Sequence, residues 1–316
     1  IDYYDHVPYL FGCVNDAMAV REVLVRHGNG SVNFDCKLII GTGPNSHVER
    51  DTIKDQVAEL FKTQAEIALL YFSGHGYIEP TGGYLLASDA SRGDHGLSLT
   101  EVLTLADVSP AQNKVIILDS CHSGIACTLP GTEGRAVISE NLTVLTASTS
   151  DQYATEANGR GVFTSLMVDA LKGGAANLTG DITPGSIYAY IDQSLGAWEQ
   201  RPVFKTNVQR LVSLRKVPAS IKLEELRQIT DLFPASDMEF RLNPTFEPEA
   251  KGRDPDMPPP DPKNVRKFTI LQRLNRLNLV IPVDAPHMWH AAMQSKSCKL
   301  TTLGQHYHRL VKKGRI

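Results

Sequence analysis

Short runs of consecutive apolar residues alternate, over the first two thirds of the chain, with stretches whose apolar residues recur every three or four positions. The runs at 67–72, 115–118 and 142–147 are typical of strands buried on both faces of a sheet. The periodic stretches predict amphipathic helices, which we place at 17–28, 48–62, 97–106, 163–171 and 186–195. Strands alternating with helices indicate a mainly parallel sheet flanked by helices, which is an α/β fold.

Weaker patterns add two strands and a helix cap. Residues 34–40 are predicted to form a strand, and the alternation at 209–214 predicts the last strand of a domain that ends near Lys216. Asn15 or Asp16 is a candidate cap for the first helix, because short polar side chains accept hydrogen bonds from the free N–H groups of a first turn.

The pattern changes after Lys216. Residues 217–262 contain one predicted helix, at 223–233, followed by seven prolines between 244 and 263 that predict a semi-rigid linker. Three stretches of helical spacing follow, so residues 263–316 are expected to form a small helical domain for which a winged-helix unit is one candidate. The expected organisation is a domain at 1–216, a connecting segment at 217–262 and a basic helical domain at 263–316.

Charge separates the two ends of the chain. The net charge is −3, yet residues 1–262 carry 21 Lys and Arg against 34 Asp and Glu, whereas 263–316 carry 11 against one. A basic domain suggests a nucleic-acid or acidic partner, although lysines that merely keep a regulatory domain soluble give the same count. No run of about 18 apolar residues occurs, so no membrane partner is expected.

The cysteines are few and scattered. Five of them, an odd number, show no paired CxxC spacing. This pattern argues against a disulfide framework and a zinc site, and it favours a reducing compartment such as the cytoplasm.

Two of the buried strands end in residues capable of nucleophilic chemistry. The run at 67–72 leads into SGHG (73–76), and the run at 115–118 leads into DSCHSG (119–124). Because parallel strands end at the same edge of a sheet, we expect His75 and Cys121 to lie close together. The alternative for Cys121 is a structural thiol, since free cysteine is among the most buried residue types.

A thiol attacks as the thiolate, so it needs an adjacent base. His75 is the candidate base and could later protonate the leaving amine. His122 is the rival, but neighbouring residues on a turn usually point apart. The backbone N–H groups of Gly76 and Cys121 are candidate oxyanion donors, and one such donor is worth about 3–4 kcal/mol.

These motifs carry a family resemblance. SGHG (73–76) followed by DSCHSG (119–124) resembles the paired signature of the caspase-like cysteine peptidases, and GCVNDA (12–17) resembles their metacaspase or bacterial orthocaspase branch. The resemblance covers about residues 1–215. It implies a caspase–hemoglobinase fold with His75 as base and Cys121 as nucleophile. It also implies protein substrates, a zymogen switched on by processing or by a protein partner, and a role in regulated cell death or immune signalling.

The metacaspase branch implies a specificity as well. Asp16 and Asp119 fall on the acidic positions with which metacaspases hold Arg or Lys, and Cys13 and Ser73 fall on the walls of that pocket. Two carboxylates facing one guanidinium form a charge-assisted site, so the resemblance implies cleavage after Arg or Lys. From the residues alone, Asp16 could equally be a helix cap, and Asp119 a solvated strand end.

Three further expectations rest on the resemblance. Ser148 and Asp151 fall in the segment that follows the next strand and is similar to the family's substrate groove. Arg135 is a candidate for self-cleavage, with a solvated loop arginine as the alternative. Many metacaspases bind calcium through an acidic cluster after the histidine, but the stretch at 83–94 is thinly acidic. No cofactor and no metal site are therefore expected, with calcium left as the open candidate.

The leading function is a cysteine endopeptidase. The alternative is a nucleic-acid-associated regulator that binds through 263–316 and uses the peptidase as its effector. A third class, a binding module built on an inactive peptidase, is disfavoured because His75 and Cys121 are both present.

Overall fold

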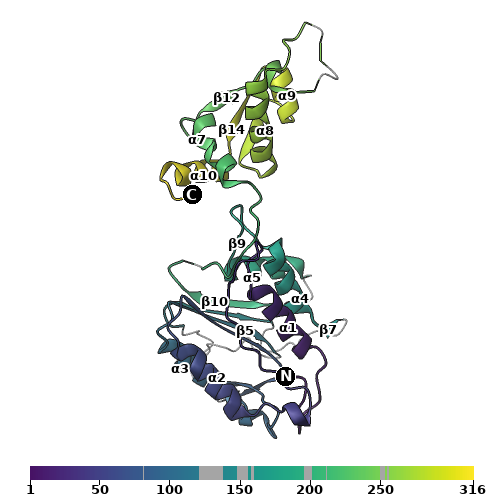
Figure 1. Ribbon diagram of the computed structural model, residues 1–316, viewed down its shortest axis with the longest axis vertical. Coiled ribbons are helices and arrows are strands. Elements are labelled where there is room, and N and C mark those ends of the chain that lie inside the picture. Colours follow the sequence, from purple (N-terminus) through teal and green to yellow (C-terminus); the bar gives the residue numbers. More distant parts are fainter. Residues whose placement is uncertain are drawn as a thin grey trace. The chain divides into compact units, whose positions relative to one another are not determined.

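A computed structural model describes residues 1–80, 82–120, 138–147, 156–157, 160–195, 201–210, 212–249, 253–254 and 256–316. The chain divides into two compact units, Ile1–Pro218 and Ala219–Ile316 (Figure 1). Across these described ranges, no helix is long and apolar enough to cross a membrane.

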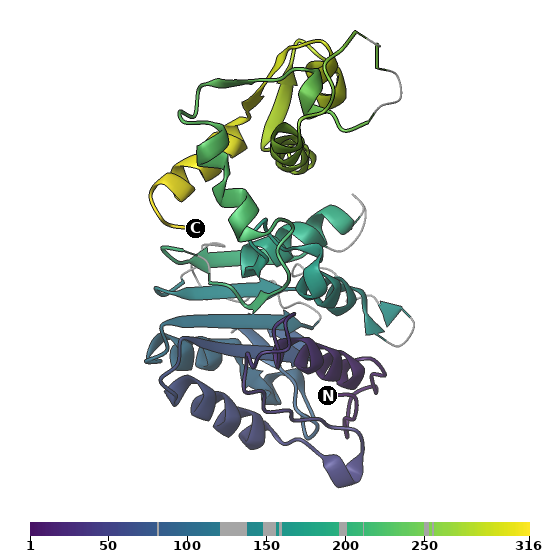
Figure 2. The same ribbon diagram turned by 45° about the horizontal axis from the view of Figure 1, so that its top comes forward.

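A four-stranded sheet forms the centre of the first unit (Figure 2). Three strands are parallel and the last is antiparallel, in the spatial order β1 (Ile67–Ser73), β5 (Asn113–Asp119), β6 (Leu142–Thr146) and β10 (Val203–Asn207). Residues 115–118 are all buried and alternate between two cores, because successive side chains of a strand point to opposite faces. The apolar runs were therefore correct signals for strands buried on both faces.

Helices cover both faces of this sheet (Figure 1). One face packs against α2 (Arg50–Lys62) and α3 (Leu99–Asp107). The other packs against α1 (Cys13–Leu24), α4 (Val162–Asp169) and α5 (Pro184–Ser194). A short π-helical stretch, Ala170–Gly174, continues α4. The predicted α/β class is confirmed.

Short elements surround the sheet. An antiparallel sheet of β2 (Gly76–Glu79), β3 (Gly82–Leu85) and β4 (Leu97–Ser98) starts directly after the first strand's polar turn. Two small ladders pair β7 (Glu156–Ala157) with β8 (Arg160–Gly161) and β9 (Asp181–Ile182) with β11 (Arg215–Lys216). Single 3-10 turns occupy Pro44–Ser46 and Gly93–His95.

Two predicted strands are wrong. Residues 34–40 pair with no strand in the described part of the chain, and Phe34 and Leu38 instead line a groove of about 390 Å³ together with Leu69 and Tyr71 of β1. Apolar alternation is insufficient here, because a strand also needs a neighbouring backbone for its hydrogen bonds. The described residues of 209–214 form no strand either, and β10 at Val203–Asn207 completes the sheet instead.

The second unit is a mixed α/β domain. An antiparallel sheet of order β12 (Glu239–Arg241), β14 (Ser297–Leu300) and β13 (Val280–Val283) packs with helices. These helices are α6 (Leu223–Arg227), α7 (Ile229–Leu232), α8 (Pro262–Arg276), α9 (Met288–Met293) and α10 (Thr302–Lys312). A 3-10 turn spans Pro244–Phe246.

The expectations for this unit need correction. The three helices predicted within 263–316 are present, but the helical domain also contains strands, each only three or four residues long. A winged helix requires a β-hairpin, whereas α9 separates β13 from β14. Part of the expected linker at 217–262 is folded into the unit, since it supplies β12 and the buried Phe233 and Phe246.

Candidate active site

The strand register aligns the two sequence motifs. Ser73 of β1 pairs with Asp119 of β5, and these are the last paired residues of both strands. His75 and Cys121 each follow two positions later in the sequence. Cys121 lies outside the described residues, so the structure describes the histidine side of the predicted pair and the residues that precede the thiol.

Main-chain and aromatic groups orient His75. Its Nε2 lies 2.8 Å from the carbonyl oxygen of Pro8, and the Tyr4 ring centroid is 4.8 Å from that of the imidazole. A carbonyl oxygen only accepts hydrogen bonds, so Nε2 carries a proton and Nδ1 is the nitrogen able to accept one. The Tyr4 hydroxyl also accepts a 2.8 Å hydrogen bond from the His75 backbone N–H. The half-buried imidazole is thus prepared to act as a base.

Sequence reasoning missed both groups that hold His75. A backbone carbonyl such as that of Pro8 leaves no signal in residue types, and Tyr4 lies about 70 positions upstream. Gly76, a predicted oxyanion donor, begins β2 opposite Leu85 of β3. The other predicted donor, Cys121, lies outside the described residues.

Asp16 is buried within α1 and does not cap it. The helix begins at Cys13 with Gly12 at its N-cap, and Asp16 is only 2% exposed. One carboxylate oxygen, Oδ2, accepts a 3.0 Å hydrogen bond from the backbone N–H of Gly161. The helix-cap interpretation is therefore wrong, and the side chain is directed to the N-terminus of α4 instead.

Asp119 is buried at the end of β5. It is 6% exposed, so the interpretation as a solvated strand end is also wrong. Its Oδ2 accepts a 2.5 Å hydrogen bond from the hydroxyl of Thr164 in α4. Both acidic side chains thus meet the first turn of the same helix, whose dipole favours negative charge at that end.

Gly161 shows how close the two carboxylates are. A Cβ built on this glycine would lie 2.7 Å from Oδ2 of Asp119 and 3.1 Å from Oδ2 of Asp16. One point within 3.1 Å of both oxygens means that the carboxylates are neighbours. The φ of Gly161 is −66°, which suits any L-residue, so backbone conformation does not call for a glycine here. The space that a Cβ would take from the two carboxylates does.

Cys13 and Ser73 complete this cluster. Ser73 is the ladder partner of Asp119, and its hydroxyl opposes the effect of burial on the pKa of the Cys13 thiol. Burial raises the pKa of Cys13 to about 12, and the charge of Asp119 acts in the same direction. Cys13 is therefore a neutral thiol near neutral pH and an unsuitable nucleophile. The structure brings together all four predicted substrate-binding residues.

Other predicted site residues lie outside the described residues: Arg135, Ser148 and Asp151. Conversely, the sequence did not single out three residues that contact the four-residue cluster or each other, namely Gly161, Thr164 and Tyr71. The glycine and the threonine occur in an ordinary helix start, and Tyr71 lies within an apolar run. None of the three shows its role in the residue pattern.

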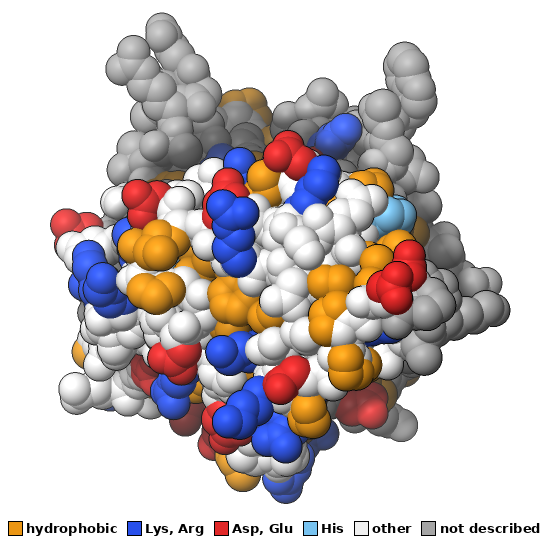
Figure 3. Space-filling model, turned by 90° about the horizontal axis from the view of Figure 1, so that it is seen from above, with side chains coloured by type: hydrophobic (Ala, Val, Ile, Leu, Met, Phe, Trp, Pro, Cys, Tyr) orange, Lys and Arg blue, Asp and Glu red, His pale blue; other side chains and the backbone are white. Residues whose placement is uncertain are grey.

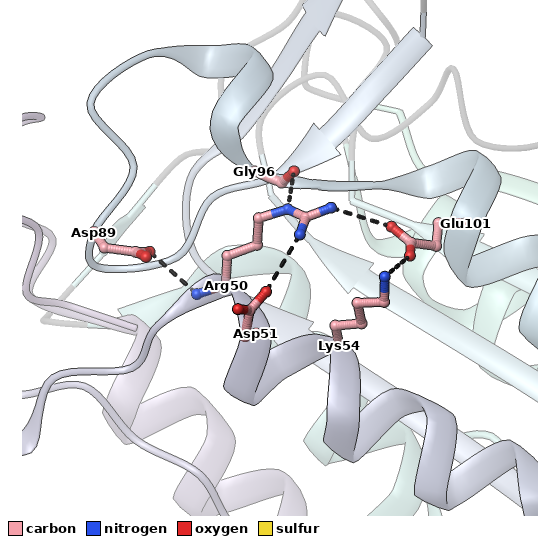
Figure 4. Close-up of polar contacts among 6 residues, drawn as sticks. All are labelled: Arg50, Asp51, Lys54, Asp89, Gly96 and Glu101. Carbon is pink, nitrogen blue, oxygen red and sulfur yellow. Dashed lines mark hydrogen bonds and ion pairs between the residues drawn. The ribbon is translucent and has the colours of Figure 1, made fainter.

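The stretch considered for calcium, at 83–94, lies beside a cation of α2, Arg50 (Figure 4). A pocket of about 480 Å³ is lined by Glu49, Arg50, Asp51, Asp89, Asp94 and His95. Arg50 donates from its guanidinium to Gly96 O and Glu101 at 3.3 Å, and from its backbone to Asp89 at 3.1 Å. Within the described residues, no group of three or more His, Cys, Asp or Glu side chains is placed to hold a metal. The expectation of no cofactor, with calcium as the open candidate, stays a prediction.

A family model matches the first unit of the chain. The model of the caspase domain matches residues 1–213, and the chain belongs to that family. Members of the family are cysteine peptidases, and this chain is a caspase-like cysteine peptidase that acts on proteins. The resemblance stated from the motifs is confirmed at this level.

Solved structures of similar fold have low sequence identity to the chain. A Geobacter sulfurreducens protein, GSU0716, is 16% identical with a TM-score of 0.48, covering 66% of this chain and 89% of that one. Caspase-1 from Spodoptera frugiperda is 16% identical with a TM-score of 0.46, covering 68% and 87%. A comparison with curated proteins found no match.

Proposed function

We propose that the chain is an endopeptidase that cleaves proteins after Arg or Lys, with Cys121 as nucleophile and His75 as base. Asp16 and Asp119 would hold the side chain of the residue that precedes the cleaved bond. The observation that carries the proposal is the pair of neighbouring buried carboxylates, one of which precedes Cys121 by two residues.

The proposed chemistry uses the two nitrogens of His75 differently. Nδ1 takes the proton of the Cys121 thiol, and the thiolate attacks the peptide carbonyl carbon while N–H groups of Gly76 and Cys121 stabilise the oxyanion. Nδ1 then returns the proton to the leaving amine, and a water molecule hydrolyses the thioester with His75 again as base. Throughout, Nε2–H keeps its hydrogen bond to the Pro8 carbonyl oxygen, and this bond fixes the tautomer and the ring orientation.

The carboxylate pair supports a cationic substrate residue. Two like charges in a small buried volume repel one another, and a guanidinium or ammonium group between them relieves that repulsion. A neutral side chain would desolvate the carboxylates without replacing their lost interactions, at a cost of about 2–5 kcal/mol. An Asp side chain would add a third negative charge.

A peptide panel tests this proposal. Wild-type chain and Cys121→Ala are assayed on otherwise identical fluorogenic peptides ending in Arg, Lys, citrulline or Asp. We expect Arg and Lys peptides to be cleaved, citrulline (a neutral isostere of Arg) to be cleaved at least tenfold more slowly, and Cys121→Ala to be inactive. Preference for Asp would refute the specificity, and activity in Cys121→Ala would refute the nucleophile.

Regulation by processing is part of the proposal. A self-cleaving enzyme that recognises Arg would cut its own chain at Arg135, and a protein partner could trigger this step in cell-death or immune signalling. Mass spectrometry of wild type beside Cys121→Ala tests the cut. A wild-type sample that cleaves peptides yet keeps its full-length mass, as Cys121→Ala keeps its own, would exclude the cut.

A second candidate function concerns the C-terminal unit. Basic side chains are exposed along α8, namely Lys263, Arg266, Lys267 and Arg276, whereas Arg273 pairs with Glu225 of α6. On the face shown in Figure 3, however, Lys and Arg lie among acidic and apolar side chains and form no single patch. Nucleic-acid binding by the full chain would weaken steeply with salt. It would also weaken in the double variant Arg266→Glu, Lys267→Glu, and unchanged retention of this variant on DNA would contradict it.

A further inference from the structure

Three side chains from different elements form a continuous chain of hydrogen bonds. The Tyr71 hydroxyl of β1 lies 2.6 Å from Oγ1 of Thr164 in α4, and Thr164 Oγ1 lies 2.5 Å from Oδ2 of Asp119 at the end of β5. Thr164 is 1% exposed and Asp119 is 6% exposed. The chain therefore runs from the middle of one strand, through the first turn of a helix, to the end of the neighbouring strand.

Chemistry fixes the direction of these hydrogen bonds. An ionised carboxylate only accepts, so Thr164 must donate to Asp119. Thr164 has a single hydroxyl hydrogen, and that hydrogen is now used, so Tyr71 must be the donor in the bond to Thr164. Each hydroxyl polarises the next, which strengthens the final bond to the charged oxygen. Its length of 2.5 Å is that of a charge-assisted O–H···O⁻ bond.

The phenol remains a donor over a wide pH range. Burial, followed by the charges of Asp119 and Asp16, raises the pKa of Tyr71 well above its usual value. Tyr71 and Ser73 are two positions apart on β1 (Ile67–Ser73), so their side chains lie on the same face of the strand. The same cluster thus connects the wall of the pocket to the hydroxyl chain.

We infer that Thr164, supported by Tyr71, is a positioning residue that fixes the plane of the Asp119 carboxylate for a cationic substrate side chain. This inference rests on the proposed function, because it assigns Asp119 to substrate recognition. An anchored oxygen fixes the side-chain torsions of Asp119, and a bidentate guanidinium contact needs such a fixed plane. The hydroxyl chain touches neither the substrate nor the reacting atoms, so its effect is expected in recognition rather than in the chemical step.

The test compares hydroxyl deletions in the full-length chain. Thr164→Val removes the donor and keeps the shape, Thr164→Ser keeps the donor, and Tyr71→Phe removes the second hydroxyl. Thr143→Val is the matched control, because the buried Thr143 hydroxyl bonds to that of Thr206 at 2.8 Å in the same sheet, where β6 pairs with β10. The readouts are kcat and KM on peptides that end in Arg or in citrulline.

We expect the Arg-over-citrulline ratio of kcat/KM to fall about tenfold in Thr164→Val and about threefold in Tyr71→Phe, mainly through KM. Thr164→Ser and Thr143→Val should keep the wild-type ratio within twofold. If Thr164→Val does not fold, the Arg-over-citrulline ratio is compared between Tyr71→Phe, which lacks a hydroxyl, and Thr164→Ser, which keeps one.

Three results would overturn the inference. Suppose that the wild type prefers Arg and that Thr164→Val and Tyr71→Phe both keep its Arg-over-citrulline ratio of kcat/KM. This result refutes the positioning role and leaves the proposed function intact. A wild-type chain that shows no preference for Arg refutes the proposed function and this inference together. A loss of kcat with unchanged ratio likewise contradicts a role in recognition.

Discussion

His75, the proposed base, and the carboxylate pair are held by different kinds of contact. His75 follows β1 and is half-buried, and it is positioned by the Pro8 carbonyl and by Tyr4, which both precede α1 in the chain. Asp16 and Asp119 are nearly inaccessible and accept hydrogen bonds from the first turn of α4. A histidine that exchanges protons must remain reachable by substrate, whereas a charge that recognises a substrate works best when it is fixed.

This difference predicts two separable sets of defects. Changes around His75 should alter the chemical step and leave the choice of substrate residue unchanged. Changes around α4 should alter that choice and leave the thiol reactive. The physical reason is that the two halves of the site share a sheet edge but use separate supporting residues, Pro8 and Tyr4 in one case and Gly161 and Thr164 in the other.

The largest effect is expected from His75→Ala. Loss of a general base typically costs about 10²–10⁴-fold, so kcat/KM should fall by about 10³-fold. A reversible peptide inhibitor that carries Arg should still bind with wild-type affinity, as measured by fluorescence anisotropy. Loss of inhibitor binding together with activity would show that the two halves of the site are not separable.

Asp119→Asn should give the opposite pattern. The change keeps the size of the side chain but removes one charge, so kcat/KM for Arg peptides should fall by about 10²-fold. Citrulline peptides should be cleaved within a few fold of the wild-type rate. The rate of Cys121 alkylation by iodoacetamide, followed by mass spectrometry, should not change, and a variant that still prefers Arg as strongly as wild type would contradict the role of Asp119.

The sequence was a good guide to the sheet edge. Runs of apolar residues that stop at SGHG and DSCHSG predicted two parallel strands with chemistry at their ends, and the Ser73–Asp119 register agrees with this. The residues at 34–40 show the limit of such patterns. Their alternation is that of a strand, but strand formation depends on a pairing backbone elsewhere in the chain.

The contacts that distinguish the two halves could not be predicted from the sequence. Asp16 has the residue type of a helix cap and stands near a helix start, yet its partner is the backbone of Gly161, which is 145 positions away. The partner of His75 is a carbonyl oxygen, a group that every residue carries. In the second unit, strands of three or four residues produce too short a pattern to recognise.

Gly161→Ala tests the crowding of the carboxylates. A new Cβ would lie 2.7 Å from Asp119 Oδ2, so at least one carboxylate must move. Overpacking typically costs about 1–3 kcal/mol, and we expect KM for Arg peptides to rise about tenfold with kcat within threefold of wild type. Gly43→Ala is the matched control, because its Cβ would meet nothing within 4 Å. An unchanged KM in Gly161→Ala would mean that the pocket tolerates displaced carboxylates.

The smallest effect is expected from Tyr4→Phe, on the other half of the site. The ring still packs on the imidazole, but the His75 backbone N–H loses its 2.8 Å acceptor. A single hydrogen bond is worth about 0.5–1.5 kcal/mol, so kcat should fall by about threefold to tenfold. The Arg-over-citrulline ratio should stay at the wild-type value, as it should in the control Tyr9→Phe, whose ring stacks on Tyr3. If the ratio falls in Tyr4→Phe while kcat stays constant, Tyr4 supports recognition rather than the base, and the division of the site into two independent halves is wrong.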